Sequence, residues 1–260
     1  MAILQSRTQT GISWVKESLA LFKLSPRKWL MLALAYVGLF MILPAQPSFQ
    51  FFAFISILLW PVFIAVAMRM FRNAELNKTE SLTSVLQALQ PKIAILALLG
   101  ALCLLYGAAV SFILNADIQG MAVFAQANTA MTESKMALLM QKMLPFLLKL
   151  TVFLIPLMMA TWFAPMLIAF NNYSLTKAIK SSVAGSLQYM VALGAAWMLL
   201  TSGIVMLMLG VGIVVGILAA LVPSVAQLFM SLIIFGCLLL ASALMLAFQY
   251  VSYRDIFRAA

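Results

Sequence analysis

The chain has 260 residues, of which 65% are hydrophobic and 8% are charged, and its mean hydropathy is +1.11. This composition excludes a soluble globular domain, because several uncharged runs exceed the roughly 18 residues that mark a membrane-spanning helix. The net charge of +10 could suggest a nucleic-acid partner, but in a membrane protein the positions of the charges matter more than their sum. We expect an all-α polytopic membrane protein without a nucleic-acid partner, since the alternating segments of about 10 residues that are typical of a barrel are absent.

Hydropathy and charge predict six transmembrane helices. The expected spans cover residues 29–43, 51–70, 92–115, 145–170, 189–222 and 228–251. The fifth run would measure about 51 Å as a straight helix, against a hydrocarbon core of about 30 Å. It is therefore either one bent helix or a span with a re-entrant piece. Two separate crossings are disfavoured, because they would place Arg254 and Arg258 on the outer side.

A short amphipathic helix precedes each outgoing span. These helices begin at Ser13, Ser81 and Ser174, and each repeats apolar residues at intervals of three or four. The predicted apolar stripes are Val15, Leu19 and Phe22 in the first helix and Leu175, Ile179, Val183 and Leu187 in the third. This pattern is typical of helices that lie in the membrane interface. All but three of the sixteen Lys and Arg residues then fall on one side, which the positive-inside rule assigns to the cytoplasm together with both termini. The exceptions are Lys135, Lys142 and Lys149.

Two stretches allow a competing interpretation. The basic start, an apolar run and Ala45 come in the order of a signal peptide, but the charged part is long and the cleavage site is poor, so a retained anchor is favoured. Residues 116–144 are expected to form the one long outer loop, with Thr132 capping a helix that begins at Glu133. Methionines on that helix could bind Cu(I). Interfacial packing is favoured instead, and no cofactor is expected.

The chain is predicted to be a single integral membrane domain, residues 1–260, built from three parallel copies of one unit. The units cover about residues 13–72, 81–172 and 174–257. WPVFIAVAMRMFRN, from Trp60 to Asn73, resembles WFAPMLIAFNN, from Trp162 to Asn172. SLTSVL at Ser81 likewise resembles SLTKAI at Ser174. These likenesses predict a pseudo-threefold repeat, which differs from the inverted repeats of many transporters.

Three groups of residues are candidates for particular roles. The candidate contacts for anionic lipid are Lys16, Lys23, Lys177 and Lys180, although each of these charges could equally serve only to fix the topology. The candidate helix kinks are Pro61, Pro156 and Pro165. Gly212 and Gly216 have the G-x-x-x-G spacing that lets two helix backbones approach closely, within the subunit or, as the alternative, in a homodimer. Lys149 is expected to reach the outer interface by snorkelling.

Three sequence segments carry a family resemblance. They are the opening pattern of Trp14, Leu21, Phe22, Pro26 and Trp29, the segment WFAPMLIAF from Trp162 to Phe170, and the ending YVSYRDIF from Tyr250 to Phe257. Together they resemble an uncharacterised group of proteobacterial inner-membrane proteins. More distantly, the layout is similar to the membrane domain attached to some glycerophosphodiester phosphodiesterases. The resemblance implies a six-helix inner-membrane protein, and it carries over no catalytic residue because the soluble phosphodiesterase domain is missing here.

The residue inventory favours a protein without enzymatic activity. There is no histidine, no glycine-rich phosphate loop and no pair of carboxylates within a span, so zinc sites, histidine triads and nucleotide loops are all disfavoured. We expect a role in envelope homeostasis, through contact with anionic membrane lipids or as an assembly partner in a membrane complex or homo-oligomer. The alternative is a small transporter or permeation subunit for a lipid or small molecule, because proline-broken spans can line a polar pathway.

Overall fold

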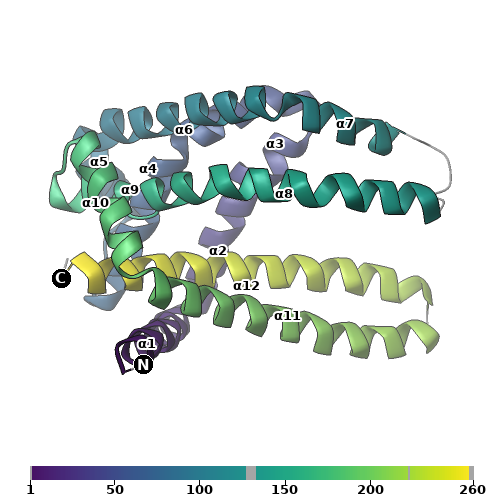
Figure 1. Cartoon of the computed structure of the whole chain (residues 1–260). Helices are drawn as coiled ribbons and strands as arrows, with labels where there is room; N and C mark the ends of the chain where they lie inside the picture. The colour runs from purple at the N-terminus through teal and green to yellow at the C-terminus, as the bar shows by residue number, and fades with distance from the viewer. Residues whose placement is uncertain (1, 127–132, 222, 258–260) are drawn as a thin grey trace.

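The computed structural model describes residues 2–126, 133–221 and 223–257, and these are almost entirely helical, with no strand. In chain order the elements are α1 (Ala2–Leu24), α2 (Pro26–Val37), the π-helical turn η1 (Gly38–Ile42), α3 (Leu43–Ala45), η2 (Pro47–Phe49), α4 (Gln50–Glu75), α5 (Leu82–Leu89), η3 (Gln90–Lys92), α6 (Ile93–Ile113), α7 (Asn115–Gln126), α8 (Glu133–Thr161), α9 (Ala164–Asn171), α10 (Leu175–Gln188), α11 (Met190–Leu221) and α12 (Pro223–Phe257). Helices α6, α8, α11 and α12 lie roughly along one axis, with α5, α9, α10 and the C-terminus gathered at one end (Figure 1).

Six helices of the described chain are long and apolar enough to cross a membrane, which confirms the predicted number and indicates a multi-pass membrane protein. They cover Pro26–Ala45, Phe51–Glu75, Leu82–Ile113, Met136–Asn171, Met190–Ala219 and Phe229–Phe257. The fifth run forms the continuous helix α11 of 32 residues. No re-entrant turn interrupts it, so its length beyond the hydrocarbon core must be taken up by tilting or by projection from the membrane.

The expected outer loop at 116–144 is helical in its first part, which was not predicted, whereas the helix predicted to begin at Glu133 is confirmed. Helix α7 covers its first part, and α8 begins at Glu133. Ala, Met and Gln are good helix formers, and Asp117 lies in the first turn of α7, where the helix dipole favours a negative charge. Lys149 of α8 donates to both carboxylate oxygens of Asp117, at 3.0 and 2.9 Å. This lysine is therefore paired across the α7–α8 hairpin. The predicted cap at Thr132 lies outside the described residues.

The fourth span is interrupted between Thr161 and Ala164, where α8 ends and α9 begins. Pro165 stands in the first turn of α9, a position that needs no backbone N–H. Pro61 and Pro156 lie inside α4 and α8, which continue through them. Of the three candidate kinks, only Pro165 adjoins a break in the helix.

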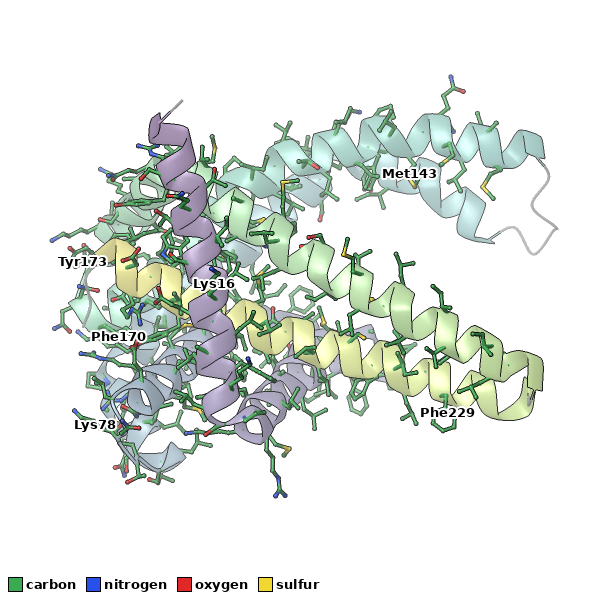
Figure 2. All side chains as sticks on the ribbon, turned by 90° about the horizontal axis from the view of Figure 1, so that it is seen from below. Lys16, Lys78, Met143, Phe170, Tyr173 and Phe229 are labelled. Carbon is green, nitrogen blue, oxygen red and sulfur yellow. The ribbon has the colours of Figure 1, made fainter. Side chains whose placement is uncertain are left out.

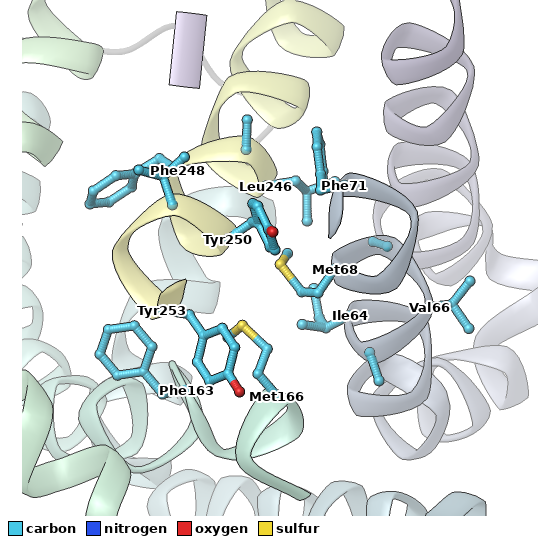
Figure 3. Close-up of a cluster of buried hydrophobic side chains, with 14 of the residues drawn as sticks. Ile64, Val66, Met68, Phe71, Phe163, Met166, Leu246, Phe248, Tyr250 and Tyr253 are labelled. Carbon is cyan, nitrogen blue, oxygen red and sulfur yellow. The ribbon is translucent and has the colours of Figure 1, made fainter. Parts of the chain in front are cut away.

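Helices α4, α9 and α12, which belong to the second, fourth and sixth spans, form the centre of the bundle. Helix α12 packs against α4, and α9 also packs against α4. Between them lie fully buried aromatic side chains, which Figure 3 shows converging from the three helices. Phe71 of α4 stacks on Tyr250 of α12 with ring centres 6.1 Å apart, and Phe163 meets Phe257 at 5.3 Å. The core therefore joins parts of the chain that lie far apart in the sequence.

Helix α1 crosses α11 and α12 at a steep angle (Figure 2). It begins at Ala2 rather than at the predicted Ser13. In this added part Gly11 lies against α11: a Cβ there would lie 2.4 Å from the Ala192 carbonyl oxygen, so only glycine permits this close approach. Trp14 is fully buried, and its indole Nε1 donates to Asp255 of α12 at 2.8 Å. These contacts fasten the N-terminal helix to the last span.

The buried faces of α1 and α10 differ from the predicted apolar stripes. In α1 the buried residues are Gly11, Trp14, Ser18 and Leu21, whereas the predicted stripe contained Val15, Leu19 and Phe22. In α10 they are Ala178, Ser182, Gly185 and Ser186, whereas Leu187 of the predicted stripe is exposed. Small residues face the protein because they let the helices approach closely. The larger apolar side chains are left half-buried or exposed beside them.

Polar side chains gather at one end of the bundle, called the charged end below and formed by α5, α10 and the neighbouring ends of α1, α4 and α12 (Figure 2). Arg254 of α12 pairs with Glu17 of α1 and Glu75 of α4. Tyr250 donates to the same Glu75 at 2.5 Å. The three elements are therefore joined by one ionic cluster. At the opposite end the α7–α8 and α11–α12 hairpins diverge (Figures 1 and 2).

Candidate functional site

The predicted lipid-contact lysines all lie at the charged end and are exposed. Lys16 and Lys23 are on α1, and Lys177 and Lys180 are on α10. The ammonium of Lys177 lies 4.0 Å from the centre of the Tyr173 ring, a cation–π distance. None of the four lines a described cavity. They form a dispersed basic surface rather than a pocket.

The glycine pair on α11 is not a helix contact within the described chain. A Cβ at Gly212 or Gly216 would meet no atom within 4 Å. The close approaches occur instead at Gly11, at Gly100 and at Gly185, where a Cβ would meet another helix at 2.4, 2.4 and 2.8 Å. Sequence spacing could not distinguish these positions, because the far half of α11 belongs to the diverging end.

An apolar groove of about 1030 Å³ lies between α2, η1, α4 and α5 and is called the α2–α4 groove below. Arg27 and Lys28 line it at the charged end, and Leu43 and Phe52 line it at the other. Because helical residues rise 1.5 Å each, the distance from Arg27 to Leu43 is roughly 24 Å along the helix. The groove therefore follows most of one span. Its volume is at the upper end of the range of about 300–1,000 Å³ that ligand pockets occupy.

A π-helical turn shapes the middle of this groove. In η1 the backbone is wider than in an α-helix, and the hydroxyl of Ser56 on α4 donates to the Leu39 carbonyl oxygen at 2.8 Å. This hydrogen bond fixes α4 against the turn while satisfying a buried acceptor. Leu82 and Leu86 of α5, which are 56% and 40% exposed, line the groove from its side. The apolar face of α5 therefore borders the groove.

The entrance of the groove carries positive charge, and no carboxylate of the described residues lines it. Arg27 and Lys28 are exposed in the first turn of α2, directly after the N-cap Ser25 and Pro26. The partial positive charge of the helix N-terminus adds to theirs. Five carboxylates of the described chain are engaged elsewhere: Glu17 and Glu75 with Arg254, Glu80 with Arg69, Asp117 with Lys149, and Asp255 with Trp14. An anionic group is the complement that this entrance lacks.

Glu80 shows how a carboxylate at the charged end is held. Arg69 donates to it through Nε at 3.2 Å, and Asn73 donates through Nδ2 at 2.9 Å. The hydrogen bond from Arg69, followed by the one from Asn73, lowers the pKa of Glu80 below its ordinary value. Glu80 is therefore bonded to two residues of α4, and it does not neutralise the cations at the groove entrance.

Two further cavities lie between other helices of the bundle. The central cavity, about 470 Å³, is bounded by α2, η1, α4, α8, α11 and α12, and its polar lining residues are Tyr36, Trp60, Thr161, Trp162, Thr201, Ser242 and Gln249. The α8–α11 pocket, about 480 Å³, is almost entirely apolar. Met158 and Trp162 line both, so the two cavities adjoin. No charged residue lines either of them.

The break beside these cavities is supported by neutral hydrogen bonds. The Phe163 N–H donates to the Ser182 hydroxyl at 3.0 Å, and that hydroxyl donates to the Met159 carbonyl oxygen at 2.7 Å. Gln249 of α12 donates through Nε2 to the Trp162 carbonyl oxygen at 2.7 Å. The backbone groups freed by the break are thus satisfied inside the membrane region, as they must be there.

Sequence reasoning missed the groove and the supports of the break. Arg27 and Lys28 follow a Ser-Pro helix start, which was a usable signal for a charged helix entrance. Ser182 and Gln249 gave no local signal, because their partners are distant in the sequence. Among the described residues no cluster of His, Cys, Asp or Glu could hold a metal ion. Comparison with protein-family models, with curated proteins and with solved structures gives no match.

Proposed function

We propose that this chain is a non-enzymatic membrane protein that binds an anionic membrane lipid in the α2–α4 groove. The observation that carries the proposal is an apolar groove of about 1030 Å³ with Arg27 and Lys28 at one end. A phospholipid has the same division, with a charged phosphate at one end and long apolar chains behind it. The phosphate would lie against the two cations, and an acyl chain would follow the groove towards Phe52.

The charged end is proposed to face the cytoplasm of a bacterial inner membrane. Its support is the clustering of Lys and Arg there, because basic residues are retained on the cytoplasmic side. The cytoplasmic leaflet also offers anionic lipid, which attracts each nearby Lys or Arg by about 1 kcal/mol. Lys16, Lys23, Lys177 and Lys180 would then supply a diffuse attraction, and Arg27 and Lys28 would supply the specific site.

The pseudo-threefold repeat is part of the same proposal. Two helix ends share an unusual geometry. Asn77, after α4, and Asn172, after α9, have positive φ angles of 52° and 55°. Each precedes a serine with an extended backbone, which is the N-cap residue of the next helix. Asparagine tolerates this left-handed conformation and commonly ends helices. Each of the three helices that precede a span also contacts an even-numbered span: α5 contacts α4, α10 contacts α8 and α9, and α1 contacts α12 in addition to α11. Each thus lies on the returning span of the unit before it, with α1 closing the ring on the third.

The cellular role that suits this arrangement is envelope homeostasis. The protein would act either through lipid contact, the lipid form, or by assembly into a membrane complex. The half-exposed apolar residues of α1 and α10 favour the lipid form. They lie beside the faces that pack on the protein, where they can dip into the interface while the lysines remain in water.

The test is to remove the groove charges and measure bound lipid. The variant Arg27→Gln with Lys28→Gln is reconstituted in nanodiscs that contain phosphatidylglycerol and phosphatidylethanolamine, then extracted, and the retained lipid is counted by mass spectrometry. We expect about 30-fold weaker phosphatidylglycerol binding, since two cations contribute about 1 kcal/mol each. The matched control, Lys177→Gln with Lys180→Gln, removes the same charge outside the groove.

Filling the groove gives an independent arm. Ala35 lines the groove and is exposed, so Ala35→Phe places a ring in it, whereas Ala109→Phe places the same ring on an exposed face of α6 that lines no described cavity. The proposal requires lipid loss from the first variant alone. Equal retention in all variants, or equal loss from the groove pair and the control pair, would contradict it.

A permeation role is the second candidate. The central cavity favours it, because its mainly apolar lining includes uncharged polar groups, and cavities beside broken helices can lie on a transport path. Its test is flux of small uncharged solutes into proteoliposomes. Flux equal to that of protein-free liposomes would remove it.

A further inference from the structure

The packing of the outgoing spans is uneven. Helix α2 packs against α12 and α6 packs against α4, so each outgoing span covers the returning span of the preceding unit. By the same rule α11 would cover α8. It packs on α12 and α1 instead, and the α8–α11 pocket lies where the third contact would be. The bundle is therefore open to the lipid side between α8 and α11, and the pocket there adjoins the central cavity.

The two adjoining cavities divide by polarity. Ile155, Met159, Leu193 and Met198 give the α8–α11 pocket its apolar walls. The central cavity adds hydrogen-bonding groups that carry no charge, among them the hydroxyls of Thr201 and Ser242 and the amide of Gln249. Gln249 is 5% exposed and uses Nε2 on the Trp162 carbonyl, which leaves its amide oxygen as an acceptor.

Trp162 stands between the two cavities with an unmet donor. Its indole Nε1 is buried and has no hydrogen-bond partner in the described structure. Buried donors are nearly always satisfied, so an orphaned one calls for an explanation such as a missing ligand. Nε1 has almost no accessible surface of its own, so the indole must turn before an acceptor oxygen of a molecule in the two cavities can supply the partner.

The depth of the central cavity restricts the ligand further. Thr201 is 11 residues into α11 from Met190, and Ser242 is 12 residues before Arg254, which places both about 16–18 Å from the charged end. That depth is close to the middle of a hydrocarbon core of about 30 Å. A charged headgroup would be costly there, and no lining residue could neutralise it.

We infer that the α8–α11 pocket and the central cavity together bind a neutral lipid of the diacylglycerol class. An acyl chain occupies the apolar pocket, and the uncharged glycerol and ester group occupies the central cavity. The ester carbonyl accepts from Trp162 Nε1, and the free hydroxyl donates to the amide oxygen of Gln249. This site is separate from the anionic-lipid groove. It favours a neutral lipid over a charged one, because no charged residue lines it.

The experiment uses a photoreactive diacylglycerol and a phosphatidylglycerol probe with the same acyl chains. Each is added to the full chain in phosphatidylcholine nanodiscs, and the labelled peptides are identified after irradiation. We expect the diacylglycerol probe to label α8 near Met158 and α11 near Leu193, and unlabelled diacylglycerol to compete. The phosphatidylglycerol probe should label α2 and α4 instead. Non-saturable labelling, or equal labelling of α8 and α11 by both probes, would overturn the inference.

A pair of glycine variants on one helix provides the matched control. Gly194 lines the α8–α11 pocket, and a Cβ there meets no atom within 4 Å, so Gly194→Leu fills the pocket without a backbone clash. Gly203 has equally open space and lines no described cavity. Gly194→Leu should lose most diacylglycerol labelling, and Gly203→Leu should keep it. Equal labelling of the two variants would contradict the site.

Two further variants separate this site from the groove and probe the donor. Arg27→Gln with Lys28→Gln should keep diacylglycerol labelling, so the two proposals can fail independently. Trp162→Phe keeps an aromatic ring but removes Nε1, and it should weaken labelling while Gly203→Leu does not. Unchanged labelling in Trp162→Phe would show that the indole donor does not hold the ligand.

Discussion

Two segments of the chain, called landings below, have similar sequences but are stabilised by different interactions. Each connects a span to the next short helix. The first landing is residues 69–89, where α4 ends and α5 begins, and the second is residues 162–188, from the α8–α9 break through α10. Charged groups hold the first: Glu75 pairs with Arg254, and Glu80 accepts from Arg69. The second is held by neutral groups on Ser182, Gln249 and Tyr253, whose hydroxyl donates to Asn171 at 2.5 Å.

The difference follows from where each helix is interrupted. In α4 Pro61 lies within a helix that stays continuous, so the interruption comes only at the charged end, where charged side chains can reach water. In the second copy the break at Trp162 lies about nine residues inside the span, or about 13 Å from its end. Ion pairs are costly at that depth. Hydroxyl and amide groups are the partners that can satisfy a broken backbone there.

Removal of the Ser182 hydroxyl is expected to have the largest effect on this comparison. Ser182→Ala leaves the Phe163 N–H and the Met159 carbonyl without their partner, and each unsatisfied buried group costs about 1–3 kcal/mol. Thermal unfolding in detergent should show a clear fall in the midpoint, and raised salt should not change that fall. Ser181→Ala, one residue earlier, is the control. A loss that disappears at high salt would show that this landing also depends on charge.

Replacing the serine at the start of each short helix should change the unfolding midpoint by a smaller amount, and the change should differ between the two helices. The Ser81 hydroxyl accepts from the Ser84 N–H at 3.2 Å, whereas Ser174 makes no side-chain cap. Losing a serine cap costs about 1 kcal/mol. Ser81→Ala should therefore lower the unfolding midpoint, and Ser174→Ala should change it little. Equal losses would show that the two serines act alike in spite of their different hydrogen bonds.

The comparison also shows what the sequence could specify. Hydropathy predicted six spans correctly, because 18 or more apolar residues leave few alternatives to a crossing helix. Helix starts at Ser81 and Ser174 were also correct, since the N-cap preference is local. The interfacial position of the short helices and the threefold repeat stay predictions.

What could not be predicted depends on contacts between distant segments. The stretch around Asp117 was expected to be a loop but forms α7, which pairs with Lys149 of α8. Gly212 and Gly216 had the expected spacing, but Gly11 and Gly100 made the close contacts. The groove required the π turn at η1, which comes from packing rather than from a recognisable motif. The polar support of the break came from Ser182, which a local pattern would have assigned to the solvated face.

The smallest expected effect is a dependence of the first landing on pH. Because hydrogen bonds from Arg69 and Asn73 lower the pKa of Glu80 below its ordinary value of 4.5, folding favours its charged form. That contribution to stability is fully present above about pH 4.5 and is lost as the pH falls through the lowered pKa of the folded protein. Unfolding midpoints measured from pH 6 to pH 3 should fall more steeply for the wild type than for Glu80→Gln. Ser182→Ala should keep the slope of the wild type, because the groups it removes do not titrate. Parallel curves for the wild type and Glu80→Gln would mean that the Arg69–Glu80 contact does not hold the first landing in solution.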